Sequence, residues 1–203
     1  MKKPVAAVIL ATLGMVAGNA MAEQSPWLVR VRVERLSPAD KADPVGGAGA
    51  SDRISVSKKT IPELDISYFF SPNVSAELIL TYPQKHDVYL DGGKIGTFKH
   101  LPPTLLGQYH FTPEATFSPY VGAGLNYTNI TKVDLLNGAG GLEHKSFGLA
   151  LQAGADYKID KNWSLNFDVK KIQIRSDVTI SGAKVSNVQV DPWLVGVGVG
   201  YRF

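Results

Sequence analysis

Cysteine is absent from the 203 residues of the sequence. This excludes disulfides, zinc sites built on thiolates and cysteine nucleophiles, so stability must come from packing and hydrogen bonding. Long apolar runs are also absent after residue 22, where none approaches about 18 residues, and no membrane-spanning helix is predicted. The formal net charge is +3, and without Lys2 and Lys3 it becomes 3 − 2 = +1. This balance gives no ground for nucleic-acid binding, which needs a basic patch on the folded domain.

The first 22 residues have the layout of a secretory signal peptide. Two lysines precede an apolar run from Pro4 to Gly18, and the triplet Ala20-Met21-Ala22 supplies the small residues of a cleavage site. A membrane anchor is the alternative, but the run is shorter than the roughly 20 residues that a spanning helix needs. We therefore expect a signal peptide over residues 1–22, a mature chain over residues 23–203 and export from the cytoplasm.

Apolar and polar residues alternate with period two through most of the mature chain, which predicts strands with unlike faces. In the first such segment, Val29, Val31 and Val33 share one face, and Arg30 and Arg32 share the other. Eight segments show this alternation: PWLVRVRVERL, ELDISYFF, NVSAELILTY, LPPTLLGQYHF, PYVGAGLNYT, KSFGLALQAGADY, NWSLNFDVK and PWLVGVGVGYRF. Alternation alone also fits a soluble sandwich, whose apolar face is buried.

The spacing of aromatic residues favours a transmembrane barrel over a sandwich. Trp193 and Phe203 are separated by ten positions on one face, as are Phe147 and Tyr157. At ~3.3 Å per residue and a tilt of roughly 40°, this distance spans about 25 Å, the height of the apolar band between the two aromatic girdles of such barrels.

Two further patterns agree with a barrel. The connections between segments alternate between long and short, as external loops and periplasmic turns do. Charges interrupt the apolar face only at Arg35 and Lys171, near the expected interface, where a cation costs about 0–1 kcal/mol instead of about 2–4 at the midplane. The sequence thus predicts an all-β fold, an eight-stranded antiparallel transmembrane up-and-down β-barrel with long external loops, short periplasmic turns and both termini in the periplasm.

The last strand ends in an aromatic pair, Tyr201 and Phe203. A closed barrel requires this strand to pair with the first, because every backbone polar group in lipid needs a partner. The ending looks like the outer-membrane sorting signal, which would make the outer-membrane assembly machinery a partner. Alternatively, the pair anchors the lower aromatic girdle.

Three blocks closely resemble the OmpW/AlkL family: LPPTLLGQYHF (101–111), SPYVGAGLNYT (118–128) and VDPWLVGVGVGYRF (190–203). The resemblance implies an eight-stranded barrel in the lipid bilayer of a bacterial outer membrane and uptake of small hydrophobic molecules. Relatives are thought to narrow the lumen with an apolar residue on the third strand and an aromatic residue on the seventh, which correspond to Ile79 and Lys170 here. Because Lys170 departs from that pattern, we expect an ion pair of Lys170 with Asp168 or Glu77 to replace the aromatic.

The interior of an eight-stranded barrel is just wide enough for side chains to fill it, so a wide porin-type pore is not expected. The inward positions at the lower and middle levels are charged, and we expect them to pair into a plug, since unpaired buried charge is costly. These residues are Arg30, Arg32, Glu34, Glu63, Asp65, Glu77, Asp168 and Lys170.

Towards the external side the inward positions turn apolar, which suggests a vestibule for a hydrophobic solute, closed below by the plug. Its candidate ligand-binding residues are Leu36, Ile79, Pro102, Ile130, Ile172, Ile174 and Leu194. Such a solute would leave sideways, through the wall. Prolines weaken a strand ladder, so Pro83 and Pro102-Pro103 mark a plausible lateral exit, although they fit equally well as strand terminators near the loops.

The four histidines do not suggest an enzyme. His86, His100, His110 and His144 show no triad spacing and no HExxH motif, so we expect solvated or lumen-satisfied histidines, no catalysis, no cofactor and no metal. Two functions stay open. An apolar vestibule favours transport of small hydrophobic molecules, whereas a fully packed polar lumen favours a surface receptor or structural barrel, for which the glycine-rich segment 44–50 suits partner contact.

Overall fold

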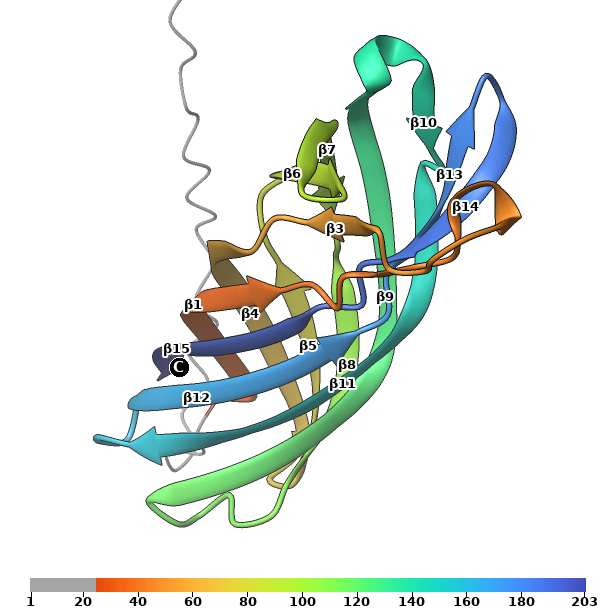
Figure 1. Ribbon diagram of the computed structural model, residues 1–203. Helices are drawn as coiled ribbons and strands as arrows, with labels where there is room; N and C mark the ends of the chain where they lie inside the picture. The colour runs from red at the N-terminus through yellow and green to blue at the C-terminus, as the bar shows by residue number, and fades with distance from the viewer. Residues whose placement is uncertain (1–24) are drawn as a thin grey trace, which may run out of the picture.

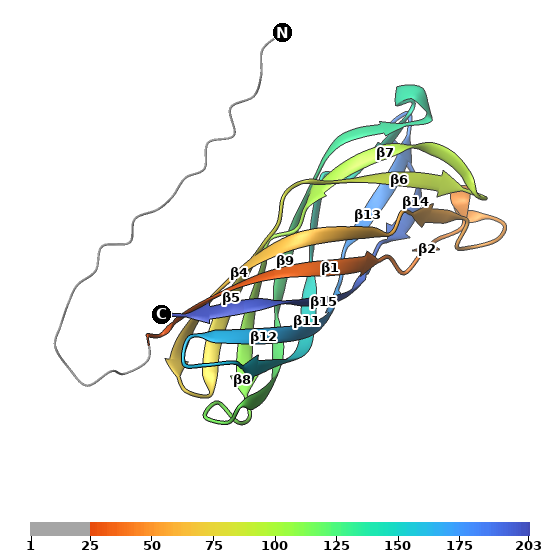
Figure 2. The ribbon, with the colours of Figure 1, turned by 90° about the vertical axis from the view of Figure 1, so that its left-hand side faces the viewer.

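The computed structural model describes residues 25–203, so the predicted signal peptide lies outside the described residues. Eight antiparallel strands form a closed barrel, in the order β1-β4-β5-β8-β9-β11-β12-β15 and back to β1 (Figures 1 and 2). They are β1 (Trp27–Ser37), β4 (Lys59–Ser71), β5 (Val74–Leu80), β8 (Thr104–His110), β9 (Phe117–Leu135), β11 (Lys145–Lys158), β12 (Trp163–Ile172) and β15 (Trp193–Arg202). The predicted fold class is confirmed. No helix within residues 25–203 has the length and apolar character to cross a membrane.

Closure of the barrel depends on the last strand, as expected. β15 pairs with β1 from Leu28↔Arg202 to Ser37↔Trp193, and with β12 on its other edge. Both edges of the terminal strand are therefore hydrogen-bonded. Tyr201 packs edge-on against Trp163 and Phe203, with ring centroids 4.9 and 5.0 Å apart.

The barrel has its apolar face outside and its charged face inside. Val197 is 61% exposed and Leu149 58%, whereas Arg30 and Arg32 are completely buried. Exposed aromatic rings stand at both ends of the wall, with Trp163 and Phe203 at one end and Phe147 and Trp193 at the other. Lys171 lies at the second ring, its ammonium 5.1 Å from the Trp193 ring centroid. This arrangement matches an apolar band bounded by aromatic girdles.

Beyond the girdle of Phe147 and Trp193, the predicted long connections are present and contain further strands, which the sequence analysis did not predict. The extension contains β2 (Lys41–Ala42), β3 (Ile54–Val56), β6 (Gln84–Leu90), β7 (Gly93–Leu101), β10 (Gly140–Leu142), β13 (Arg175–Ile180), β14 (Ala183–Gln189) and two short 3-10 helices, η1 (Val45–Gly47) and η2 (Leu136–Gly138). In Figure 2 the β6–β7 and β13–β14 hairpins stand at the opposite end from the C-terminus.

Short turns with positive backbone φ close these two hairpins. Asp91 and Gly92 have φ values of 50° and 80°, and Ser181 and Gly182 have 50° and 83°. Such pairs give the twist that two-residue hairpins need. β9 supports the extension because it continues past the barrel to pair with β7 and β10.

One segment of the barrel wall lacks its ladder. β5 pairs with β8 up to Ile79↔Thr104, and pairing resumes above, between β6 and β7, at Gln84↔His100. Within the described chain no ladder pair joins residues 81–83 to residues 102–103, and we call these two stretches the seam. The prolines therefore interrupt a ladder that continues on both sides of them.

Candidate functional site

A buried ion cluster fills the middle of the barrel. Lys170 on β12 lies at its upper side, with its Nζ 2.6 Å from Asp168 Oδ1, 2.6 Å from Glu63 Oε1 and 2.9 Å from Glu34 Oε1. Of the two expected partners of Lys170, Asp168 is found and Glu77 is not. One ammonium thus holds together carboxylates from three strands, β1, β4 and β12.

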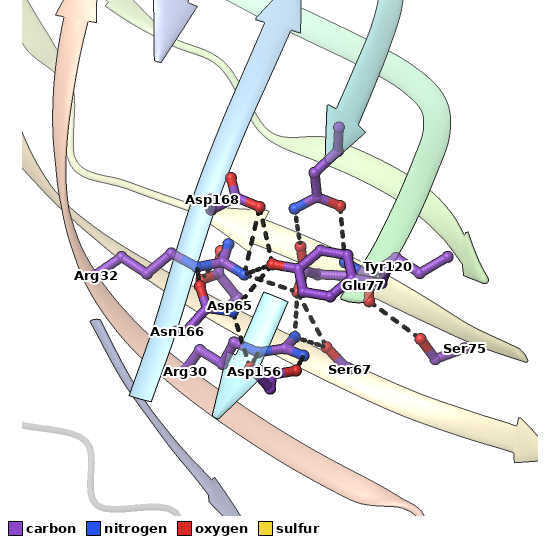
Figure 3. A network of polar contacts seen from close by, with 12 residues as sticks. Arg30, Arg32, Asp65, Ser67, Ser75, Glu77, Tyr120, Asp156, Asn166 and Asp168 are labelled. Carbon is purple, nitrogen blue, oxygen red and sulfur yellow. Dashed lines mark hydrogen bonds and ion pairs between the residues drawn. The ribbon is translucent and has the colours of Figure 1, made fainter. Parts of the chain in front are cut away.

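The two arginines of β1 bind the remaining carboxylates (Figure 3). Arg30 forms ion pairs with Glu77, at 2.7 Å, and with Asp156, at 2.6 Å. Arg32 Nη1 lies 2.9 Å from Asp65 Oδ2 and 3.3 Å from Glu63 Oε1. The guanidinium groups therefore cross the lumen and tie β1 to β4, β5 and β11. All eight residues predicted for the plug are at most 4% exposed and lie in this cluster.

Neutral side chains complete the cluster, and sequence analysis did not single them out. The Tyr120 hydroxyl accepts a hydrogen bond from Arg32 Nη2 at 3.1 Å and donates one to Asp168 at 2.9 Å. Asn166 bridges Arg32 and Asp156, and Gln152 donates to Glu77 at 2.9 Å. Their inward positions in alternating strands were the available signal. We call the charged and neutral residues together the plug.

The side chains of the plug pack closely against the backbone of the barrel wall. A Cβ added at Gly196 would lie 2.3 Å from the Glu34 carboxyl carbon, so only glycine leaves room for that carboxylate. Three cations, Arg30, Arg32 and Lys170, face six carboxylates, Glu34, Glu63, Asp65, Glu77, Asp156 and Asp168. A lumen of such tightly paired charges is a poor route for an apolar solute.

Above the plug the interior is apolar. Six of the seven predicted vestibule residues, Leu36, Ile79, Ile130, Ile172, Ile174 and Leu194, are buried in one hydrophobic cluster. Pro102 is only half-buried and lies in the seam, apart from that cluster. The apolar interior extends upward into the strands beyond the barrel, because Val88, Phe98, Leu135 and Val178 belong to the same cluster.

A narrow cavity that opens to solvent lies in this upper part, with a free volume of about 20 Å³, enough for about one water molecule. Ile130 is the one predicted vestibule residue on its wall. The other lining residues belong mainly to the extension: Ile54, Val56, Val88, Ile95, Phe98, Leu135, Leu142, Ser176, Val178, Val188 and Val190. These residues were not predicted, because the alternation that marks the barrel strands does not extend into their short strands.

The seam keeps its contacts on one side only. The Pro103 carbonyl accepts a hydrogen bond from the Tyr127 amide of β9 at 3.1 Å. The Pro102 carbonyl accepts hydrogen bonds from the Asn126 side chain of β9, at 3.3 Å, and from the Thr104 hydroxyl, at 3.2 Å, and Pro102 has no N–H to donate. The segment is thus held to β9 and unpaired towards β5.

Three of the four histidines are buried, and two of these, His86 and His100, have ring nitrogens without a hydrogen-bond partner, which corrects the expectation of solvated or lumen-satisfied histidines. His86 and His100 are completely buried on the inner face of the β6–β7 hairpin, and their ring centroids are 4.7 Å apart. Lys85 and Lys99 form a register pair between them on the opposite, outer face, which places the hairpin outside the apolar band. Burial lowers the pKa of His86, and burial lowers the pKa of His100 to about 3. Both rings are therefore neutral near pH 7.

The remaining two histidines differ from this pair. His110 is buried near the lower mouth, where its Nε2 lies 3.2 Å from the Ser75 hydroxyl, and His144 is exposed. Across residues 25–203, no group of three or more His, Cys, Asp or Glu side chains is arranged to hold a metal ion.

Comparison with known proteins places these features in a family. The profile of the OmpW family matches residues 23–203. An uncharacterized outer-membrane protein of Sinorhizobium fredii, y4mB, is 43% identical over 95% of this chain and 84% of its own length. Outer membrane protein W of Vibrio cholerae is 33% identical over 89% of this chain and 90% of its own. PahQ of Pseudomonas aeruginosa, named as a dibenzothiophene metabolism operon protein, is 25% identical over 92% and 93%.

Solved structures agree with this match. The crystal structure of the outer membrane protein OprG from Pseudomonas aeruginosa superposes with a TM-score of 0.79 at 30% identity, covering 89% of this chain and 97% of OprG. The NMR structure of the outer membrane protein AlkL in DMPC lipid bilayers gives a TM-score of 0.70 at 25% identity, covering 94% and 96%.

Proposed function

Because this chain belongs to the OmpW family of outer-membrane barrels, we propose that it takes up small hydrophobic molecules from the cell exterior. The observation that carries the proposal is the apolar lining of the narrow cavity above a charged plug. The pocket is concave and almost wholly apolar, as small-molecule sites are, and it must widen before such a solute can enter. The name of PahQ connects one relative with the metabolism of such a compound.

The exit in this proposal is sideways, through the seam. Downward passage would bring an apolar molecule against Arg30, Arg32 and Lys170, all at most 1% exposed and paired with carboxylates. The seam lies at the level where the apolar cluster meets the barrel wall, next to Ile79 and Thr104. Separating strands there breaks no ladder hydrogen bond to β5, whereas separating them elsewhere in the wall breaks several.

Uptake is tested with a variant whose larger side chain fills the cavity. Dibenzothiophene entry is followed in intact cells that lack their own copy of the protein, because apolar tracers cross plain phospholipid bilayers unaided. Val178→Phe places a larger side chain in the cavity wall and should reduce entry to the level of cells without the protein. Val31→Phe, on the lipid-facing side of β1, is the matched control and should leave entry unchanged. Equal entry with and without the protein would instead favour the receptor or structural barrel.

The lateral exit is tested with a variant that restores the missing backbone N–H donor. Pro102→Thr supplies the backbone N–H that the seam lacks, so it should strengthen pairing across the seam. Dibenzothiophene entry should fall, while binding of the same compound to the purified barrel should stay within about twofold of wild type. Unchanged entry in this variant would contradict the lateral route and leave the cavity as a binding site only.

A further inference from the structure

Three buried polar side chains on the β6–β7 hairpin, above the seam, lack hydrogen-bond partners for part of their polar atoms. Gln84, His86 and His100 are all completely buried. Within the described residues, four of their polar atoms have no hydrogen-bond partner: Gln84 Oε1, His86 Nε2, and both ring nitrogens of His100. Leaving a buried polar group unpaired costs about 1–3 kcal/mol, so such a concentration of neutral polar atoms in one place calls for a hydrogen-bonding partner.

The position of these residues links them to the proposed path. Gln84 and His100 are the first register pair above the seam. His100 is also paired with Ile130, which lines the cavity, and both imidazole rings contact Phe98 of the cavity wall, at centroid distances of 5.7 and 5.8 Å. The three polar residues do not line the cavity themselves, so a ligand in the cavity reaches them by displacing Phe98, the wall residue that both rings contact.

The hydrogen-bond donors and acceptors of these three residues determine which polar group of a ligand they can bind. His86 Nδ1 lies 2.8 Å from the Ser57 carbonyl oxygen, so the neutral ring carries its proton there and Nε2 is an acceptor. Gln84 Nε2 already donates to the Tyr82 carbonyl at 2.8 Å, and its Oε1 is a second acceptor. Neutral His100 adds one acceptor and one donor.

A site with three acceptors and one donor fits a hydroxyl group, which both donates and accepts. A carboxylate or a ketone can only accept, so it matches one of the four atoms. Resting on the function proposed above, we propose that Gln84, His86 and His100 form a polar subsite that binds the hydroxyl of an otherwise hydrophobic alcohol or phenol. The preferred solutes would then be hydroxylated hydrophobic compounds rather than pure hydrocarbons.

The test compares two probes with one carbon skeleton, 1-naphthol and naphthalene, bound to the purified full-length barrel in lipid nanodiscs. His100→Phe removes one donor and one acceptor and keeps a planar ring. It should raise the Kd of 1-naphthol roughly three- to tenfold and leave the Kd of naphthalene within about twofold of wild type. Phe98→Leu, in the apolar wall, is the control and should weaken both probes equally. 1-Naphthoate carries a carboxylate in place of the hydroxyl, and it should bind more weakly than 1-naphthol.

The possible outcomes distinguish the proposed polar subsite from the proposed uptake function. If naphthalene binds and His100→Phe affects both probes equally, the subsite is wrong and the hydrophobic cavity stands. If neither probe binds the wild-type barrel, both the subsite and the proposed uptake function are wrong. Because His100→Phe replaces a buried unpaired polar ring with an apolar one, its folding is checked by urea resistance, and Gln84→Leu gives an independent second variant with the same expected ratio.

Discussion

Replacing Lys170 by methionine should destabilise the barrel strongly. Its ammonium lies within 2.9 Å of Glu34, Glu63 and Asp168, and the side chain is 1% exposed. Lys170→Met keeps the volume but leaves three buried carboxylates without their shared cation. Removing one partner of a buried ion pair costs about 3–5 kcal/mol, and the loss here should reach at least that range because three carboxylates are affected.

The assay is equilibrium unfolding in urea of the barrel refolded into lipid vesicles at pH 7.5, with wild type and variants run together. Lys171→Met removes the neighbouring cation, which lies at the membrane interface by Trp193, and should cost under about 1 kcal/mol. Adding Glu34→Gln to Lys170→Met removes a carboxylate whose ion pair was with Lys170 and should recover part of the loss. A loss below about 1 kcal/mol in Lys170→Met would refute the idea that this cluster holds the barrel together.

Two further predictions concern the ends of the barrel. Acidification should loosen the β6–β7 hairpin: unfolded His100 takes up a proton below its ordinary pKa of 6.5, while the folded ring stays neutral down to about 3. Stability is therefore lost as pH falls below 6.5, by about 2 kcal/mol at pH 5, and the loss ends near pH 3. Hydrogen exchange of this hairpin at pH 7 and pH 5 measures it, and a pH dependence that persists unchanged in His100→Phe would contradict it. At the other end, Phe203→Ser should reduce barrel assembly in cells but not refolding in vitro if Tyr201 and Phe203 act as a sorting signal. Equal effects of Phe203→Ser and the girdle variant Phe111→Ser would favour simple anchoring.

Strict alternation made the barrel wall predictable from sequence. Arg30 and Arg32 alternate with Val31 and Val33, and in an eight-stranded barrel the polar face of such a strand can only point into the lumen. The same logic located the eight charged plug residues and six apolar residues above them. Whether those apolar residues bind a solute stays a prediction.

The extension was not predictable in the same way, for two reasons. Its strands are short and carry polar residues on the outer face, so VYLDGGKIGTF resembles a loop unless Asp91-Gly92 is taken as a hairpin turn. The cavity wall also depends on contacts between distant segments, such as Ile54 with β6 and Leu142 with β13, that no local pattern encodes. The choice of ion-pair partners, Glu63 and Glu34 for Lys170, likewise depends on strand register and stagger.

The central claim is that a hydrophobic solute occupies the upper cavity and leaves through the seam without passing the plug. A dibenzothiophene analogue carrying a photoreactive diazirine, activated after it binds the barrel in nanodiscs, would mark its path by mass spectrometry. We predict labels on inward residues above the plug, such as Phe98, Val178 and Ile79, and none at the lower mouth, where Leu28 and His110 line a second pocket. Labels at Leu28 and His110 would show passage through the plug and contradict the account.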